Sequence, residues 1–148
     1  MKKFILLNLF IYIQACTPFK LSPVDFSWPI ESVLRVNNQG FALEERYSMK
    51  INVMQLFIDE FGQVNNINDK EIRIIRNASG TYFITASGFK NVYLFKQDES
   101  SLLLIKKIFV SEIGLENPYF NQRDNHIELV FGDKKLKLNN NGIIGDKK

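Results

Sequence analysis

Residues 71–110 decide the fold, and they read EIRIIRNASG TYFITASGFK NVYLFKQDES SLLLIKKIFV. This stretch contains four apolar runs, at residues 71–76, 81–86, 91–96 and 102–110. The gaps between the runs hold four or five residues rich in Gly, Asn, Asp or Ser, which are the residue types that turns favour. Short connections between consecutive strands favour antiparallel neighbours. The stretch therefore predicts four consecutive strands of one antiparallel sheet.

The sequence on both sides of this stretch also predicts hairpins. Toward the C-terminus, residues 127–131 and 134–138 flank the two-residue turn Gly132-Asp133. Toward the N-terminus, residues 32–36 are followed by Asn37-Asn38-Gln39-Gly40, a good turn sequence. We therefore expect the strand at 32–36 to pair back onto the segment that follows this turn.

That following segment, residues 41–53, alternates between apolar odd positions and polar even positions. Such a period of two is typical of one half-buried strand. The side chains expected to face the core are Phe41, Leu43, Tyr47, Met49 and Ile51. Residues 54–61 fit either a short helix or a continued strand. The sequence as a whole predicts an all-β domain, a small antiparallel sandwich or a partly open barrel of about eight strands, with one short helix near 54–61 as an option.

The N-terminal residues have the features of a secretory signal. Two lysines, Lys2 and Lys3, precede an apolar run at residues 4–13 that is broken only by Asn8. A transmembrane helix needs about 20 consecutive apolar residues, and this run has about half of that length before Pro18 follows. A cleaved leader is therefore a better interpretation than a permanent membrane span.

The end of the leader resembles the bacterial lipobox. Ile13 and Ala15 stand three and one residues before Cys16, which is the only cysteine of the chain, while Gln14 replaces the usual small or hydroxylated residue. The resemblance implies that Cys16 is lipidated on its thiol and becomes the new N-terminus. Cleavage at another position, with Cys16 inside the leader, is the alternative. Because Thr17 and not an aspartate follows Cys16, the resemblance favours the outer membrane over the inner one.

These features divide the chain into three parts. Residues 1–15 form the expected signal peptide, residues 16–28 a lipid-attached tether with Pro18 and Pro23, and residues 29–148 a single β domain. Removal of the leader takes two lysines away, so the formal charge of +3 falls to +1. Nucleic-acid binding needs clustered Lys and Arg, so a near-neutral domain argues against it. Oligomeric state is left open by the sequence.

Residues for catalysis or metal binding are few. His126 is the only histidine, and a Ser–His–Asp arrangement would have to combine it with Asp124 or Asp133 and a distant serine. Structural zinc needs four Cys or His ligands, which this chain does not have. The densest group of oxygen ligands, at residues 65–71, lacks the order of an EF-hand. We therefore expect no metal, no cofactor and no enzymatic activity, with a hydrolase that uses His126 as the least favoured reading.

One segment favours a binding role. Residues 111–126 show no clear period, and loops of this length in compact domains tend to be functional or disordered. Aromatic, amide and guanidinium groups suit recognition because rings give rigid contact area and forked donors give specificity. The candidate binding residues are Tyr119, Phe120, Gln122, Arg123 and His126. The other reading of this segment is a loop that its apolar residues hold over one end of the sheet.

These observations favour a membrane-anchored envelope lipoprotein whose β domain is a non-catalytic binding or assembly module. The expected partner is another envelope protein, and the domain would face the periplasm or the cell surface. Polysaccharide or host-surface binding is the alternative.

Overall fold

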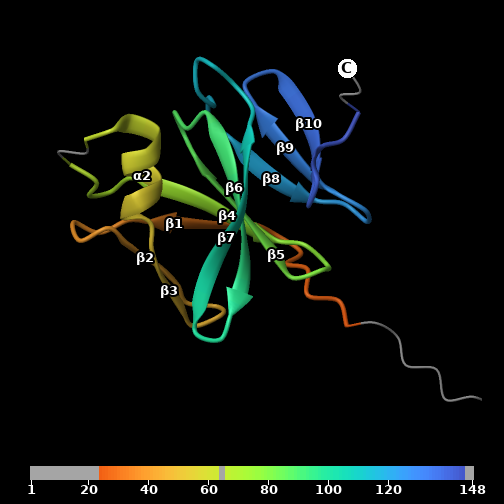
Figure 1. The fold of residues 1–148 in the computed structure, drawn as a ribbon, viewed down its shortest axis with the longest axis horizontal. Coiled ribbons are helices and arrows are strands. Elements are labelled where there is room, and N and C mark those ends of the chain that lie inside the picture. The colour runs from red at the N-terminus through yellow and green to blue at the C-terminus, as the bar shows by residue number, and fades with distance from the viewer. Residues whose placement is uncertain (1–23, 64–65, 146–148) are drawn as a thin grey trace, which may run out of the picture.

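The computed structural model describes residues 24–63 and 66–145 (Figure 1). Cys16 and the signal segment lie outside the described residues. Within those ranges the chain forms eleven strands and one helix. The elements are β1 (Ser32–Arg35), β2 (Phe41–Glu44), β3 (Met49–Asn52), α2 (Met54–Phe61), β4 (Glu71–Arg76), β5 (Thr81–Ala86), β6 (Asn91–Asp98), β7 (Ser101–Phe109), β8 (Tyr119–Gln122), β9 (Ile127–Phe131), β10 (Lys134–Asn139) and β11 (Gly142–Ile143).

The largest sheet has five antiparallel strands in the order β1-β4-β5-β6-β7. The four consecutive strands predicted from residues 71–110 are confirmed as β4 to β7. All six residues of β5 are buried, since β5 is the central strand and other elements cover both faces of the sheet. Side chains on both faces of the sheet can therefore be apolar in this strand.

A second antiparallel sheet, in the order β11-β10-β9-β8, packs against one face of the five-stranded sheet. The predicted hairpin around Gly132-Asp133 is confirmed as β9–β10. Glu31 joins the two sheets, because one carboxylate oxygen accepts a bond from Arg73 at 2.5 Å and the other from the backbone N–H of Phe120 at 2.7 Å. An isolated bridge between Ile30 and Asn121 also connects the two sheets, and the described residues form antiparallel sheets without a closed barrel.

The helix α2 covers the opposite face of the five-stranded sheet (Figure 1). Its Phe57 ring packs edge-to-face on Phe89 with centroids 5.0 Å apart. On the polar side of the helix, the Tyr93 hydroxyl donates to the carboxylates of Asp59 and Glu60. Burial, with these two carboxylates beside it, raises the pKa of the Tyr93 phenol. Of the two structures that residues 54–61 fit, the short helix is therefore the one observed, and a sheet tyrosine anchors it.

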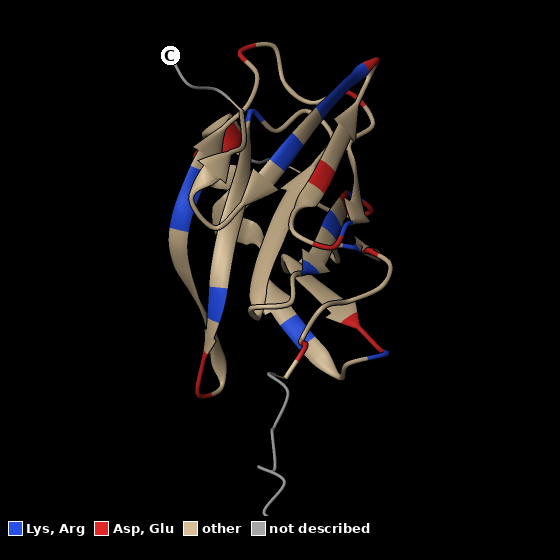
Figure 2. Ribbon diagram, turned by 90° about the vertical axis from the view of Figure 1, so that its right-hand side faces the viewer, with Lys and Arg blue, Asp and Glu red and all other residues tan. Residues whose placement is uncertain are grey.

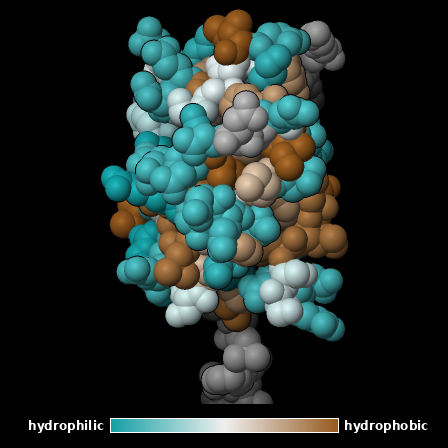
Figure 3. Space-filling view, turned by 90° about the vertical axis from the view of Figure 1, so that its left-hand side faces the viewer, coloured by the Kyte–Doolittle hydropathy of each residue, from teal (hydrophilic) through white to brown (hydrophobic). Residues whose placement is uncertain are grey.

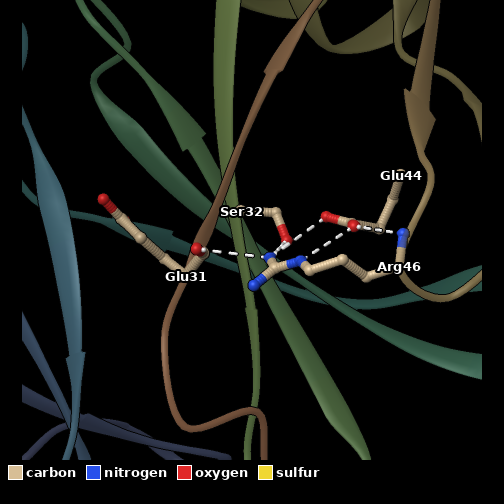
Figure 4. A network of polar contacts seen from close by, with 4 residues as sticks. All are labelled: Glu31, Ser32, Glu44 and Arg46. Carbon is tan, nitrogen blue, oxygen red and sulfur yellow. Dashed lines mark hydrogen bonds and ion pairs between the residues drawn. The ribbon is translucent and has the colours of Figure 1, made fainter.

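The hairpin β2–β3 also lies on this face, and a buried ion pair attaches it to β1 (Figure 4). The Glu44 carboxylate is only 3% exposed and accepts bonds from the Arg46 backbone N–H at 3.0 Å and from Arg46 Nε at 3.1 Å. Arg46 also donates to the Ser32 hydroxyl and, at 3.4 Å, to the Glu31 carbonyl. Burial opposes ionisation of Glu44, but the bonds from Arg46 and Ser32 outweigh it, so the pKa of Glu44 is lowered.

The prediction of one strand over residues 41–53 is wrong. A four-residue turn at 45–48 reverses the chain, so that Phe41 faces Asn52 and Glu44 faces Met49. Odd positions of β2 therefore share a face with even positions of β3, and Leu43 is 55% exposed instead of buried. The expected hairpin of residues 32–36 with this segment is also wrong in its main pairing, because β1 pairs with β4 and only Val36 bridges to Ala42.

The prediction that residues 111–126 lack regular structure also needs correction. Residues 119–122 form β8, which pairs with β9 along its whole length. The irregular part is therefore confined to the short stretches before and after β8. Before β8, the Leu115 backbone N–H bonds to the Phe89 carbonyl and the Gly88 N–H bonds to the Leu115 carbonyl, both at 2.8 Å. These bonds fix the segment against the β5–β6 turn.

Candidate functional site

The candidate residues from the sequence do not form one site. Tyr119 and Phe120 are neighbours on β8 and point to opposite sides, as alternation in a strand requires. Phe120 is 3% exposed and belongs to the hydrophobic core, whereas Tyr119 is 40% exposed. Phe120 is therefore a packing residue, and only Tyr119 of this pair is available to a partner.

Arg123 follows β8 and lies on the surface. Its guanidinium forms an ion pair with Glu128 of β9 at 2.9 Å. Bonds from Asn121 and Arg123 lower the pKa of the Glu128 carboxyl. Arg123 therefore has a partner within its own chain, and a ligand would have to compete with Glu128 for it.

Gln122 and His126 lie together in a polar depression of about 300 Å³ between the β4–β5 turn and the β10–β11 turn. We call this the amide depression, and its lining residues are Asn77, Ala78, Ser79, Gln122, Asp124, Asn125, His126, Asn139, Asn140 and Asn141. Asn77 Nδ2 donates to Asn140 Oδ1 at 2.8 Å, and Asn140 Nδ2 donates to Ser79 Oγ at 2.9 Å. These side chains hydrogen-bond to one another, so the depression is largely a contact that connects the β4–β5 turn of one sheet with the β10–β11 turn of the other.

Two polar groups of the depression, the Gln122 amide and the His126 ring, take no part in these hydrogen bonds between the turns. The Gln122 Oε1 atom is buried and has no hydrogen-bond partner, while Gln122 Nε2 donates to the Arg123 carbonyl. In the part of the chain that the structure describes, no carboxylate and no serine hydroxyl binds the His126 ring. The geometry therefore shows no Ser–His–Asp arrangement around His126.

A larger groove, of about 650 Å³, lies between β3 and the β6–β7 turn. We call it the aromatic groove. Its lining residues are Trp28, Phe41, Tyr47, Ser48, Met49, Lys50, Ile51, Asn52, Arg76, Tyr82, Gln97, Ser100, Ser101 and Leu102. Figure 1 shows the β2–β3 hairpin beside the lower end of β6 and β7. Trp28 is 3% exposed, stacks on Tyr47 with centroids 4.1 Å apart, and meets the edge of Tyr82 at 5.5 Å.

The charged residues that line the aromatic groove are all positive. Its lining includes the cations Lys50 and Arg76 and no carboxylate. The Arg76 guanidinium lies over the rings of Phe26 and Tyr82 at 4.8 and 4.9 Å, and the Lys50 ammonium lies 4.3 Å from the centroid of Phe41. Among the ion pairs of residues 24–63 and 66–145, none involves either cation. The groove therefore offers two cations that form no ion pair within the described part of the chain, while the acidic residues Asp98 and Glu99 lie at the tip of the neighbouring β6–β7 turn.

The third surface is β7, an edge strand of nine residues. Four of its large apolar side chains, Leu103, Leu104, Ile105 and Phe109, are between 41% and 57% exposed. Figure 2 shows the β6–β7 hairpin with acidic residues at its tip and uncharged stretches along its strands. From the opposite side, Figure 3 shows polar side chains over much of the surface, with apolar ones between them and the broadest apolar area at the right-hand side.

Lysines usually protect an exposed edge strand from pairing. The two lysines of β7 are held by their own chain: Lys107 pairs with Asp59 at 2.5 Å, and Lys106 donates to the Asn141 carbonyl at 2.6 Å. A register shift opposite Leu94 and Phe95 is the main interruption of the ladder. The apolar half of β7 before this shift therefore has no charge of its own along its edge.

Sequence reasoning missed both the groove and the edge. Trp28, which the sequence places at the end of the tether, is buried, and its backbone N–H donates to the Arg76 carbonyl at 2.8 Å. The run Leu102-Leu103-Leu104-Ile105 is apolar without alternation. Taken alone, this pattern predicts a strand that is buried on both sides and not an exposed edge strand. An apolar run followed directly by two lysines was the available signal that this strand lies at an edge.

No protein-family model matches this chain, and comparisons with curated proteins and with solved structures give no match either. Among the described residues, no helix has both the length and the apolar character for a membrane span. The same residues contain no cluster of three His, Cys, Asp or Glu side chains placed to hold a metal ion.

Proposed function

We propose that this chain is a lipid-anchored envelope protein whose β domain binds another envelope protein and has no catalytic role. The lipid would be attached to Cys16, as the lipobox resemblance implies. The observation that carries the binding role is the exposed apolar edge strand β7. The occupant is an extended, apolar segment of the partner, which adds a strand to the five-stranded sheet.

Edge geometry supports this mode of binding. An edge strand presents a row of unpaired backbone N–H and C=O groups, and a peptide that pairs with them gains main-chain hydrogen bonds. Alternate side chains of β7 then give specificity, because they lie on both sides of the new pair. The register shift near Ile105 divides the strand, so the partner segment pairs with residues 101–104.

Exposure of the apolar side chains favours a protein partner over a soluble ligand. Leu103 and Leu104 are consecutive in β7 and each exposes about half of its surface, one on each face of the sheet, and Ile105 follows them directly. Burying apolar surface contributes about 25 cal/mol per Å², so covering these side chains gives a stable contact. A partner segment that forms one strand with apolar side chains can both pair with the backbone of β7 and cover its apolar side chains.

Site-specific photo-cross-linking in intact cells tests the docking mode. We expect a photoreactive residue at Leu103 or Leu104 to cross-link to one protein species that is not this chain. The matched control is Leu43, which is 55% exposed on β2, a strand outside the five-stranded sheet. Leu104→Lys should weaken capture of the cross-linked protein by about tenfold or more, the scale of an important interface contact, whereas Leu43→Lys should not.

Other outcomes of this experiment contradict the docking mode. Cross-linking only to a second copy of the chain would replace the heterologous partner with self-association. Capture that survives Leu104→Lys but fails with Tyr119→Ala or Arg123→Ala would move the interface to the segment around β8. Equal cross-linking at Leu43 and Leu104 would show that β7 has no special role.

The membrane anchor is tested separately by intact mass. A mature species that begins at Cys16 and carries acyl mass supports the anchor, and Cys16→Ala should release the domain or leave an uncleaved precursor. A mature species that begins elsewhere without acyl mass contradicts it. Because the β7 variants do not touch Cys16, the two parts of the proposal fail independently.

A further inference from the structure

We propose that the aromatic groove is a second binding site, and that its ligand is an acidic carbohydrate such as a uronic-acid oligosaccharide. Arg76 and Lys50 would bind the carboxylate groups, and the exposed ring of Tyr47 would support a sugar ring. The groove shares Ser101 and Leu102 with the β7 segment that the proposed function uses, whereas Leu103 and Leu104 lie outside its lining.

Arg76 is held in place before any ligand arrives. Its guanidinium lies between the rings of Phe26 and Tyr82, and its Nε donates to the Gly80 carbonyl at 3.4 Å. An arginine fixed in this way loses little side-chain entropy when its remaining N–H groups bind a carboxylate. The terminal N–H groups have no hydrogen-bond acceptor among the described residues, which leaves them for a ligand.

Lys50 adds a second positive charge on the hairpin wall of the groove. The ammonium lies over the Phe41 ring and has no ion-pair partner in the described part of the chain. Charge-assisted bonds to carboxylates are about twice as strong as bonds between neutral groups. Two unpaired cations in a lining without carboxylates therefore favour an anionic ligand over a neutral or cationic one.

The remaining lining residues favour a carbohydrate over a simple anion. Side-chain amides and hydroxyls can both donate to and accept from sugar hydroxyls. The residues that provide them are Ser48, Asn52, Gln97, Ser100 and Ser101. Tyr47 is 44% exposed, and its ring is held by stacking on Trp28 and by the Arg46 guanidinium, which lies 5.5 Å from the ring centroid. A volume of about 650 Å³ lies within the range of about 300–1,000 Å³ that ligand sites occupy, which suits a short oligosaccharide.

Trp28 provides a built-in reporter, because it is the only tryptophan of the chain and lines the groove. The experiment titrates the purified full-length protein with trigalacturonate and follows tryptophan fluorescence, with calorimetry as the second measurement. The comparison ligands are a neutral galactose oligosaccharide of the same length, a glutamate oligopeptide and inorganic phosphate. We expect saturable binding of trigalacturonate only, which weakens as salt is added because the contacts are ionic.

Matched variants identify the groove. Lys50→Gln and Arg76→Gln should each weaken trigalacturonate binding by about tenfold or more, which is the change expected when one charge-assisted contact is lost. Lys70→Gln, at an exposed position outside the groove, should leave binding unchanged. Arg76→Lys keeps the charge but not the fork, so it should fall between the wild type and Arg76→Gln.

Several results would overturn the proposal. Equal binding of the neutral oligosaccharide would remove the role of the two cations. Tighter binding of the glutamate peptide or of phosphate would replace the carbohydrate with another anion. Equal losses for Lys70→Gln and Lys50→Gln would show a general charge effect, and no heat of binding together with no fluorescence change would show that the groove does not bind this ligand class.

Discussion

Replacement of Arg46 by Met should destabilise the domain more than neutralisation of its partner Glu44. The Glu44 carboxylate is 3% exposed, and Arg46→Met removes the side-chain bonds at 3.1 and 3.3 Å while the backbone N–H bond at 3.0 Å stays. Breaking a buried ion pair from one side costs about 3–5 kcal/mol. The Arg46 side chain is 44% exposed, so water already screens part of the pair, and we expect a loss of about 3 kcal/mol.

Glu44→Gln should cost less, about 1–2 kcal/mol, because the freed guanidinium can turn toward water. In the double variant no charge is left buried, so the total cost should be about 2 kcal/mol and below that of Arg46→Met alone. Urea unfolding of the three variants and the wild type gives the four corners of a double-mutant cycle. Additive costs would refute the idea that the two side chains act as a buried pair.

The pH dependence gives a second test with a definite sign. The pKa of Glu44 is lowered from 4.5 in the folded wild type, so its contribution is present above pH 4.5 and is lost as the pH falls through the folded pKa. In Arg46→Met the carboxyl keeps its burial without the guanidinium, so its pKa should rise and protonation should relieve the penalty. The stability difference between wild type and Arg46→Met should therefore shrink between pH 7 and pH 4, and a difference that grows would refute the reasoning.

Two further predictions concern packing and helix attachment. Phe120→Ala should lower the free energy of unfolding in urea by about 3–5 kcal/mol, because it empties a core position. Tyr119→Ala should lower it by less than about 1 kcal/mol. Equal costs would mean that β8 is not half-buried. Tyr93→Phe should lower the free energy of unfolding by about 1–2 kcal/mol, because α2 loses its hydrogen bonds from the Tyr93 hydroxyl. For the same reason it should increase amide hydrogen exchange in α2. Unchanged exchange would show that Phe57 and its aromatic neighbours hold the helix alone.

The sheet core was predictable because its information is local. From β4 to β7 each strand pairs with the next one, and each connection is a short turn whose residue types identify it. The same holds for β9–β10 around Gly132-Asp133. The pairing of β1 with β4 was not predictable in this way, because 35 residues separate them and only the tertiary packing selects the partner.

The candidate binding residues show the limit of loop length as a signal. Residues 111–126 lack a clear period because β8 has only four residues, too few for alternation to stand out. Gln122 and His126 do lie in one depression, but the side chains that complete it come from the β4–β5 and β10–β11 turns. A depression built from three distant turns has no signature in a single segment of the sequence.

The misread segment at residues 41–53 itself supports the role of the aromatic groove. Its apolar alternation is real, but the turn at 45–48 changes which positions share a face, so the apolar side chains do not form one buried stripe. Phe41, Tyr47, Met49 and Ile51 instead all line the groove, where each is exposed or half-buried. Departures from core patterning are expected at functional sites. The Glu44–Arg46 pair holds this hairpin against the sheet, and Met49 and Ile51 pack partly against the core while they also line the groove. The hairpin therefore covers part of the core and also forms one wall of the proposed binding site.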